Sequence, residues 1–391
     1  MFKSREVAVA ALFVGMHAIG AQDAAGYIAR IEAAQSPDRG GMDAATLEHV
    51  MQKFRVPGVS IAVVRDFKIH WAKAYGVADV ETGQPVDVNT AFQAASISKP
   101  LTAIAAVKLA QDGRLSLDDD VNNILKSWKV PPSEWTRAQP VTPRSLFSHT
   151  SGSDDGFGFP GYDPSAPMPT LVQVIRGDKP SNVGSVTFSR PPYQGMKYSG
   201  GGTVIMQVAL TDLTGQPFAD FMQATVLGPL GMTGSSYRQP PPGEWEPRLA
   251  RAHGGNGQRM GARWHVYPEQ SAAGLWTTPS DLARVVIEVQ AAVRGPRGAV
   301  LTQHGAREMT SPVGTGQYAV GFSIDKRGEG WYFGHGGSNW GFQCDLLGHI
   351  RKGYGVVVMT NGDNGGAVIR EIEARVAAAY GWDVLDKPLV R

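Results

Sequence analysis

The chain has a single cysteine, Cys344, among its 391 residues. One thiol can form neither an internal disulfide nor a cysteine-rich metal site. The nine histidines are scattered, without a His-x-His or His-x-x-x-His pair, so a zinc hydrolase is disfavoured as well. Cys344 lies in an alternating, strand-like segment, where we expect a small buried side chain. We therefore expect neither a metal nor a cofactor.

The sequence also lacks a strong charge of one sign and long apolar runs. Lys and Arg number 37 against 35 for Asp and Glu, which gives no basis for binding nucleic acid or an anionic membrane. After the first residues, nothing is long and apolar enough for a transmembrane helix. A Gly-x-Ser-x-Gly motif is missing too, which argues against a nucleophile elbow of the α/β-hydrolase kind.

The N-terminus has the pattern of a secretory signal. A basic start precedes an apolar stretch over residues 7–16, which is too short to span a bilayer. Small residues fit a cleavage site after Ala21, so we predict a signal peptide over 1–21 and a periplasmic or secreted protein. A buried N-terminal helix is the alternative. Residues 22–41 are polar and Gly-rich, and they predict a flexible lead.

Both ends of the chain carry strand patterns, and the middle carries helical ones. Short apolar or alternating runs between Gly, Asp and Lys turns are typical of antiparallel strands. Such runs lie at 59–64, 69–75, 318–324, 330–335, 341–347 and 355–360. Helical apolar spacing predicts helices at 43–54, 101–111, 202–213, 217–226, 279–290 and 368–380.

This order predicts an α/β (α+β) fold in which one antiparallel sheet is built from both chain ends and flanked by helices. A large, mostly helical lobe is inserted between those ends. The length allows a large core, and we expect a single folded unit over 42–385. Its sheet lobe comprises 42–85 plus 296–385, and its helical lobe comprises 86–295.

Ser96 and Lys99 form the first candidate site, a Ser-x-x-Lys motif at the start of an apolar helical run. Residues at i and i+3 share a helical face, so the hydroxyl and the amine can meet. Serine is a poor nucleophile until a group takes its proton, and a partly desolvated lysine can help to do so. The first helical turn also directs free N–H groups at charge developing beside Ser96. The motif alone is weak evidence for catalysis, because an ordinary helix start with a solvated lysine has the same sequence pattern.

Tyr198 lies in a glycine-rich turn just before an expected helix, between Lys197 and Ser199-Gly200. Such a turn exposes the hydroxyl and lets the backbone approach a ligand. A lysine ammonium nearby would lower the pKa of the phenol and make its proton easier to lose. An ordinary turn tyrosine is the alternative interpretation.

The segment His335-Gly336-Gly337-Ser338 lies between two expected strands. Its paired glycines would let a strand edge lie close to a substrate. The backbone N–H of Ser338 would then be a second oxyanion donor beside that of Ser96. A plain hairpin turn is the alternative.

A further small-residue loop spans residues 145–152 and contains His149 and Thr150. These two side chains would either contact the substrate or hold the loop together by hydrogen bonds. The second reading is the stronger one on the sequence alone.

Together these segments resemble the serine β-lactamase and D-Ala-D-Ala peptidase superfamily, in its class C-like branch, which includes β-lactamase-like carboxylesterases and D-aminopeptidases. Ser96 to Lys99 matches the Ser-x-x-Lys motif. Tyr198-Ser199-Gly200 stands where the branch has Tyr-x-Asn. His335-Gly336-Gly337 stands where it has Lys-Thr-Gly, with His a known variant at the first position. The resemblance covers about residues 43–380 and includes the segments 146–152, 229–232 and 273–282.

The resemblance implies a β-lactamase/transpeptidase-like fold and an acyl-enzyme mechanism. Ser96 would attack an acyl carbonyl. Lys99 and Tyr198 would together accept and return the proton, with the identity of the base left open. The N–H groups of Ser96 and Ser338 would stabilise the oxyanion.

Two positions depart from the family pattern. Gly200 lacks the amide that in relatives holds the acylamino group of the substrate and orients Lys99. His335 replaces a lysine that helps to bind the carboxylate of penicillins and peptides, and histidine is largely neutral near pH 7 unless its surroundings raise its pKa. Both changes disfavour an efficient β-lactamase. The resemblance also implies that Asn361 and Asn364 lie at the edge of the site.

The sequence therefore predicts a serine hydrolase that cleaves an ester or a peptide or amide bond, as a carboxylesterase or D,D-peptidase does. A class C-like β-lactamase is one alternative. A non-catalytic penicillin-binding or sensing module is the alternative from another class. The expected partner is a small-molecule or peptide acyl substrate, while the oligomeric state and the acyl and leaving groups stay open.

Overall fold

A seven-stranded antiparallel sheet forms the centre of the fold, in the order β3-β2-β1-β9-β8-β7-β6. The computed structural model describes residues 23–35, 42, 44–156, 158–295, 298–328 and 330–382, so the predicted signal peptide over 1–21 lies outside them. The N-terminal strands are β1 (Gly58–Arg65), β2 (Lys68–Asp79) and β3 (Gln84–Pro85). The C-terminal strands are β6 (Ser323–Arg327), β7 (Gly330–Asn339), β8 (Phe342–His349) and β9 (Gly355–Thr360).

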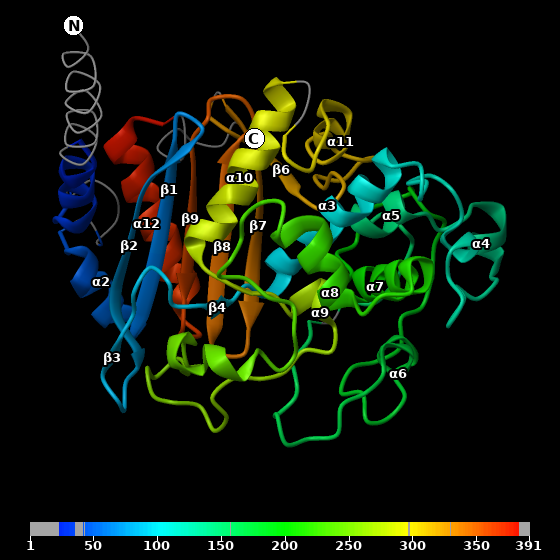
Figure 1. The fold of residues 1–391 in the computed structure, drawn as a ribbon, viewed down its shortest axis with the longest axis horizontal. Helices are drawn as coiled ribbons and strands as arrows, with labels where there is room; N and C mark the ends of the chain where they lie inside the picture. Colours follow the sequence, from blue (N-terminus) through cyan, green and yellow to red (C-terminus); the bar gives the residue numbers. More distant parts are fainter. Residues whose placement is uncertain are drawn as a thin grey trace, which may run out of the picture.

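The two ends of the chain meet in the middle of this sheet. β1 pairs with β9 in antiparallel register, with Ile61 opposite Val358. The predicted sheet built from both chain ends is therefore confirmed, and Figure 1 shows the blue and orange strands side by side.

The central strands are buried on both faces. Val59, Ile61 and Val63 of β1 belong to one hydrophobic cluster, whereas Ala62 and Val64 belong to the other. Successive side chains of a strand point to opposite faces, so a continuously apolar strand can serve two cores at once.

Helices cover both faces of the sheet. α2 (Leu47–Phe54) and α12 (Gly365–Tyr380) pack with the cluster that contains Ile61. α10 (Pro279–Arg294) packs with the other cluster and crosses in front of the sheet in Figure 1. The sequence placed this helix in the helical lobe over 86–295. It lies on the sheet because its apolar face, which includes Val286, is buried against β8 and β9.

The other helices form a lobe beside the sheet (Figure 1). They are α3 (Ser98–Gln111), α4 (Glu134–Ala138), α5 (Pro143–Phe147), α6 (Leu171–Arg176), α7 (Gly200–Thr214), α8 (Phe218–Met222), α9 (Gln270–Ala273) and α11 (Gln303–Glu308), with a small sheet of β4 (Phe92–Gln93) and β5 (Trp276–Thr277). Short helical turns are η2 (Ala95–Ile97), η3 (Val121–Asn123), η4 (Gln223–Leu227) and η5 (Gly243–Arg248). Nearly every residue of α3 is buried, because sheet and helices surround it.

Part of the predicted flexible lead over 22–41 is ordered. Residues 23–32 form a helix whose Ile31 is fully buried. The buried guanidinium of Arg375 on α12 donates hydrogen bonds to the carbonyls of Ile31 and Ala33, and Lys73 forms an ion pair with Glu32. These tertiary contacts order a segment whose own polar sequence indicated a loop.

The strand predicted over 318–324 begins later than expected. β6 starts at Ser323, and Tyr318 forms only an isolated bridge with Ser323. Gly321 adopts a positive φ of 96°, where a side chain would overlap Ala103 on α3, so the chain turns before the strand begins.

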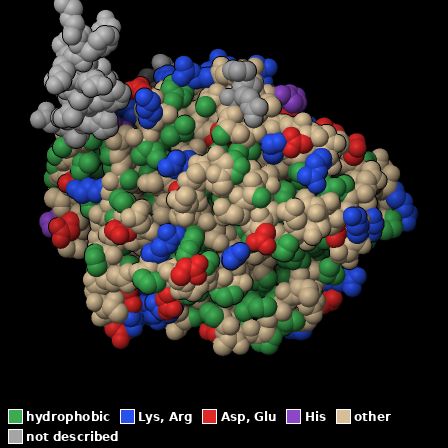
Figure 2. All heavy atoms as spheres, viewed as in Figure 1, with side chains coloured by type: hydrophobic (Ala, Val, Ile, Leu, Met, Phe, Trp, Pro, Cys, Tyr) green, Lys and Arg blue, Asp and Glu red, His purple; other side chains and the backbone are tan. Residues whose placement is uncertain are grey.

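The surface carries mixed charge. Figure 2 shows acidic and basic side chains interspersed over the face viewed, in keeping with a formal net charge of +2. Among the described residues, the helices fall short of the length and apolar character that a membrane crossing needs.

Candidate active site

Ser96 lies on a tightly held turn between β4 and α3. The turn is the 3-10 segment η2, and Ala95 within it adopts a left-handed backbone with φ 47°. The Ser98 hydroxyl donates to the Ala95 carbonyl at 2.6 Å and accepts from the Leu275 N–H at 3.0 Å. A non-glycine residue in this region of φ and ψ is held by its surroundings, as is common beside catalytic groups. Ser96 itself is half-buried.

Lys99 meets Ser96 as the motif spacing predicts. Its Nζ lies 2.9 Å from Ser96 Oγ and 2.9 Å from the carbonyl oxygen of Ala272 on α9. The side chain is 3% exposed. Burial lowers the pKa of Lys99 to about 7, while the negative charge of Asp155 opposes that shift. A large fraction of this lysine is therefore the neutral amine at neutral pH, which can accept a proton.

Tyr198, which precedes α7, also lies beside the nucleophile. Lys99 Nζ is 5.1 Å from the centroid of its ring. Burial raises the pKa of Tyr198 to about 12, against the opposing effect of a hydrogen bond with Ser96. The expectation that a lysine ammonium would make this phenol more acidic is wrong. Desolvation dominates because both groups are buried together, and Lys99 is the group whose proton is easily lost.

The end of β7 lies directly against the nucleophile turn. A side chain at Gly337 would overlap the carbonyl oxygen of Ala94 and the Sγ of Cys344, so only glycine allows this approach. β7 pairs with β6 only as far as Gly334, so the segment from residue 335 onward extends past that strand. Ser338 is exposed there, and its hydroxyl accepts a hydrogen bond from Gln343 at 2.8 Å.

His335 is a neutral side chain at this end of β7. Burial lowers its pKa to about 3, and the positive charge of Lys99 acts in the same direction. Its Nδ1 lies 2.6 Å from the carbonyl oxygen of Gly336. A carbonyl only accepts, so Nδ1 carries the proton and Nε2 is the acceptor.

The ring of Tyr198 lies in a cluster with three other rings, those of His149, Tyr318 and His335. The His149 ring lies 4.3 Å from that of Tyr198 and 4.6 Å from that of Tyr318 between centroids. Tyr318 is in turn 5.9 Å from His335. His149 Nδ1 also accepts the backbone N–H of Ser199 at 3.1 Å. His149 thus packs against the Tyr198 ring and holds the backbone of the next residue, Ser199.

Thr150 is the second residue of the 145–152 loop for which the sequence left two roles open. The hydroxyl of Thr150 is buried and lies 2.8 Å from that of Ser148. Thr150 therefore holds the loop by hydrogen bonds, which is the stronger of the two readings that the sequence left open for it.

Gly200 faces an aromatic ring instead of carrying an amide. A Cβ at this position would lie 2.6 Å from Cε2 of Phe159. Sequence reasoning missed Phe159 because its loop has no periodic pattern. It also missed Asp155, which accepts hydrogen bonds from the hydroxyl of the N-cap residue Ser199 at 2.6 Å and from the Gly201 N–H at 2.8 Å, and so supports the start of α7.

Asn361 and Asn364 are not brought to Ser96. They follow β9, which is two strands away from β7 in the sheet. The Asn361 amide donates to the carbonyls of Val77 at 3.1 Å and Ala78 at 3.0 Å. The Asn364 amide donates to Phe54 at 2.9 Å and Gly255 at 2.7 Å. These contacts do not support the predicted place at the site edge: carbonyls at the end of β2 engage the buried Asn361 amide, and those of Phe54 at the end of α2 and of Gly255 engage the exposed Asn364 amide.

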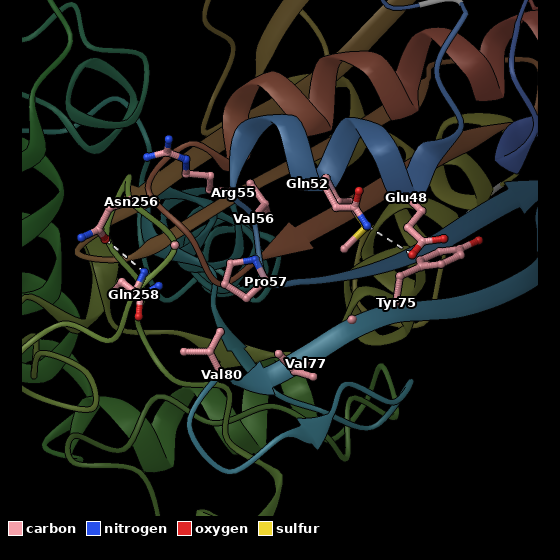
Figure 3. Close-up of a pocket in the computed structure, with 13 residues that line it drawn as sticks. Glu48, Gln52, Arg55, Val56, Pro57, Tyr75, Val77, Val80, Asn256 and Gln258 are labelled. Atoms are coloured by element: carbon pink, nitrogen blue, oxygen red, sulfur yellow. Dashed lines mark hydrogen bonds between the residues drawn. The ribbon is translucent and has the colours of Figure 1, made fainter.

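A hollow of about 550 Å³ lies elsewhere, between α2, the end of β2 and the turn at 256–258 (Figure 3). It is lined by Glu48, Arg55, Tyr75 and Val80 among others, and Ser96 is not part of its lining. Among the described residues there is no group of three or more His, Cys, Asp or Glu side chains that could hold a metal ion.

Comparison with known proteins gives both sequence and structural relatives. The chain is 27% identical to Protein flp of Staphylococcus aureus over 326 residues, which cover 81% of this chain and 61% of that protein, so it spans only about three fifths of that relative. It is 27% identical to Esterase EstB of Burkholderia gladioli, covering 74% of this chain and 77% of that one.

A crystal structure of the D-amino acid amidase from Ochrobactrum anthropi SV3 complexed with L-phenylalanine has the same fold. The TM-score is 0.65 at 22% identity, with 86% of this chain and 98% of that chain covered. A sequence model described as Beta-lactamase matches residues 44–380, which is most of the chain. The chain belongs to the Beta-lactamase family.

Proposed function

We propose that this protein is a serine hydrolase that forms an acyl-enzyme on Ser96 and hydrolyses carboxylic esters. The observation that carries the proposal is the contact of 2.9 Å between Lys99 Nζ and Ser96 Oγ, with the lysine pKa near 7. A nucleophile in hydrogen-bond contact with a group that is partly unprotonated at neutral pH is what acyl transfer requires.

Acylation follows from the protonation states of the three groups. Lys99 takes the proton of Ser96 as Oγ bonds to the acyl carbon. The backbone N–H groups of Ser96 and Ser338 then bind the oxyanion. Tyr198 stays protonated up to a pKa of about 12 and donates its proton to the departing alkoxide as the C–O bond breaks.

Deacylation returns the protons to their starting places. Water gives a proton to the Tyr198 phenolate as its oxygen bonds to the acyl carbon. Ser96 Oγ recovers a proton from Lys99 as its bond to that carbon breaks and the carboxylic acid leaves. Tyr198 is reprotonated in the same turnover, so the three groups return to their initial states.

The acyl side of the site favours esters without an acylamino group. Gly200 offers no amide to such a group, and the Phe159 ring fills the space beside it. An apolar acyl chain gains contact area there, whereas an acylamino N–H would lose its water partners without a replacement. The similarity to an esterase supports the same substrate class.

The experiment compares three acyl donors on the purified protein: p-nitrophenyl butyrate, a D-amino acid amide and benzylpenicillin. We expect turnover of the ester, with less on the amide and least on the penicillin. Ser96→Ala should abolish the ester activity, and Ser165→Ala, which removes an exposed hydroxyl elsewhere, should not. Ester hydrolysis that survives in Ser96→Ala contradicts the proposal. Preferred amide cleavage makes the protein an amidase on the same nucleophile, and preferred penicillin cleavage makes it a β-lactamase.

A further inference from the structure

His335 leaves one strong acceptor without a hydrogen bond. The side chain is 5% exposed, and its Nε2 is buried without a partner in the structure. Nδ1 already donates to the carbonyl of Gly336, so rotation of the ring would break one hydrogen bond to make another. Buried polar atoms are almost always hydrogen-bonded, so an exception at a catalytic site needs an explanation, and a donor on a bound substrate would supply one.

The imidazole ring lies beside the residue that acts on the leaving group. The ring centroid of Tyr198, which donates the proton to the departing oxygen in the mechanism above, is 6.0 Å from that of His335. Tyr318 borders the imidazole at 5.9 Å. His335 therefore lies beside Tyr198, the residue that handles the departing half of an ester.

We infer that His335 Nε2 accepts a hydrogen bond from a hydroxyl or N–H on the leaving group, so that the preferred substrates are uncharged esters of hydroxylated alcohols. This inference rests on the proposed function. It adds the class of leaving group and the residue that selects it.

The same geometry disfavours an anionic leaving group. A carboxylate has only acceptor oxygens, and it would meet the lone pair of Nε2 instead of a donor. The imidazole also carries no positive charge at neutral pH to compensate, because burial and Lys99 hold its pKa far below 7. Lys197, the residue before Tyr198, is bound to the carboxylate of Asp154 at 2.5 Å.

The test uses three butyrate esters that differ only in the alcohol: 2-hydroxyethyl, propyl and carboxymethyl. Release of butyric acid is titrated at pH 7.5, and kcat/KM is measured for the wild type, His335→Phe, His335→Gln and His335→Lys. We expect the wild type to prefer the hydroxyethyl over the propyl ester by about tenfold, the usual scale for one buried hydrogen bond.

The variants separate hydrogen bonding from packing. In His335→Phe, which fills the space without an acceptor, the ratio of hydroxyethyl to propyl should fall to near one. In His335→Gln, which restores an acceptor oxygen, the ratio should rise again. In His335→Lys the carboxymethyl ester should become the better substrate. Thermal unfolding establishes that each variant is folded, and the Gln and Lys variants suffice if Phe is not tolerated.

The outcomes distinguish the two proposals. If the wild type hydrolyses the hydroxyethyl and propyl esters with a ratio of kcat/KM near one, and hydrolysis still requires Ser96, the role of His335 is overturned and the proposed esterase activity is not. A hydroxyethyl-to-propyl ratio in His335→Phe that equals that of the wild type also overturns the role of His335. Absence of any hydrolysis that depends on Ser96 overturns both proposals.

Discussion

The pH dependence of acylation follows from the buried lysine. Lys99 must be neutral to accept the Ser96 proton, and burial holds its pKa at about 7. The activity should therefore rise with pH through neutrality. About one tenth of the lysine is neutral at pH 6 and about nine tenths at pH 8, which predicts a rise of about tenfold in kcat/KM between these values.

The assay is the initial rate of p-nitrophenyl butyrate hydrolysis at low substrate concentration, from pH 5.5 to 9. Asp155 opposes the pKa shift of Lys99 by its negative charge, so Asp155→Asn should move the rising limb to lower pH. Lys99→Arg keeps a positive charge that cannot be lost, and it should lower kcat by about 100-fold or more. A flat profile through this range, or a limb near pH 10, would refute Lys99 as the base.

Three further predictions test other parts of the structure. Tyr198→Phe should lower kcat by about 100-fold or more, because the leaving alkoxide loses its proton donor, and stopped-flow or steady-state kinetics would measure this. Gly337→Ala should lower the free energy of unfolding by about 1–3 kcal/mol, since the new methyl group overlaps the Ala94 carbonyl; thermal melting with an unchanged midpoint would speak against the close approach of β7. Burial raises the pKa of Glu373, beside Asp345, well above its ordinary value, so folding favours its protonated form and stability falls as pH rises above about 4.3. Glu373→Gln should therefore raise the melting temperature at pH 8 more than at pH 5, and an equal effect at both would count against a protonated Glu373.

The local part of the site could be predicted from the sequence. Ser96 and Lys99 meet because three residues nearly complete a helical turn, which needs no knowledge of the rest of the chain. The burial of Cys344 follows in the same way from strand alternation, and its Sγ lies 3.0 Å from the Ala94 carbonyl oxygen. The sheet made from both chain ends was predictable because its strands are short apolar runs between turns.

The non-local part could not be read from single motifs. Phe159 and Asp155 lie on an aperiodic loop, and only the tertiary path of that loop brings them to the start of α7. Asn361 was assigned to the site edge by resemblance alone, and a sequence does not show that its amide donates to the carbonyls of Val77 and Ala78 at the end of β2. The pKa of Tyr198 went the other way from the expectation, because a sequence shows neighbouring charges but not the burial that outweighs them.

The most direct test of the account is the position of a covalent adduct. The protein is treated with a fluorophosphonate, its intact mass is measured, and the labelled peptide is sequenced by tandem mass spectrometry. The account predicts one adduct, on Ser96, that is absent from Ser96→Ala and formed more slowly at pH 6 than at pH 8. An adduct on another residue, or a wild type that stays unlabelled while a known serine hydrolase is fully labelled in parallel, would contradict it.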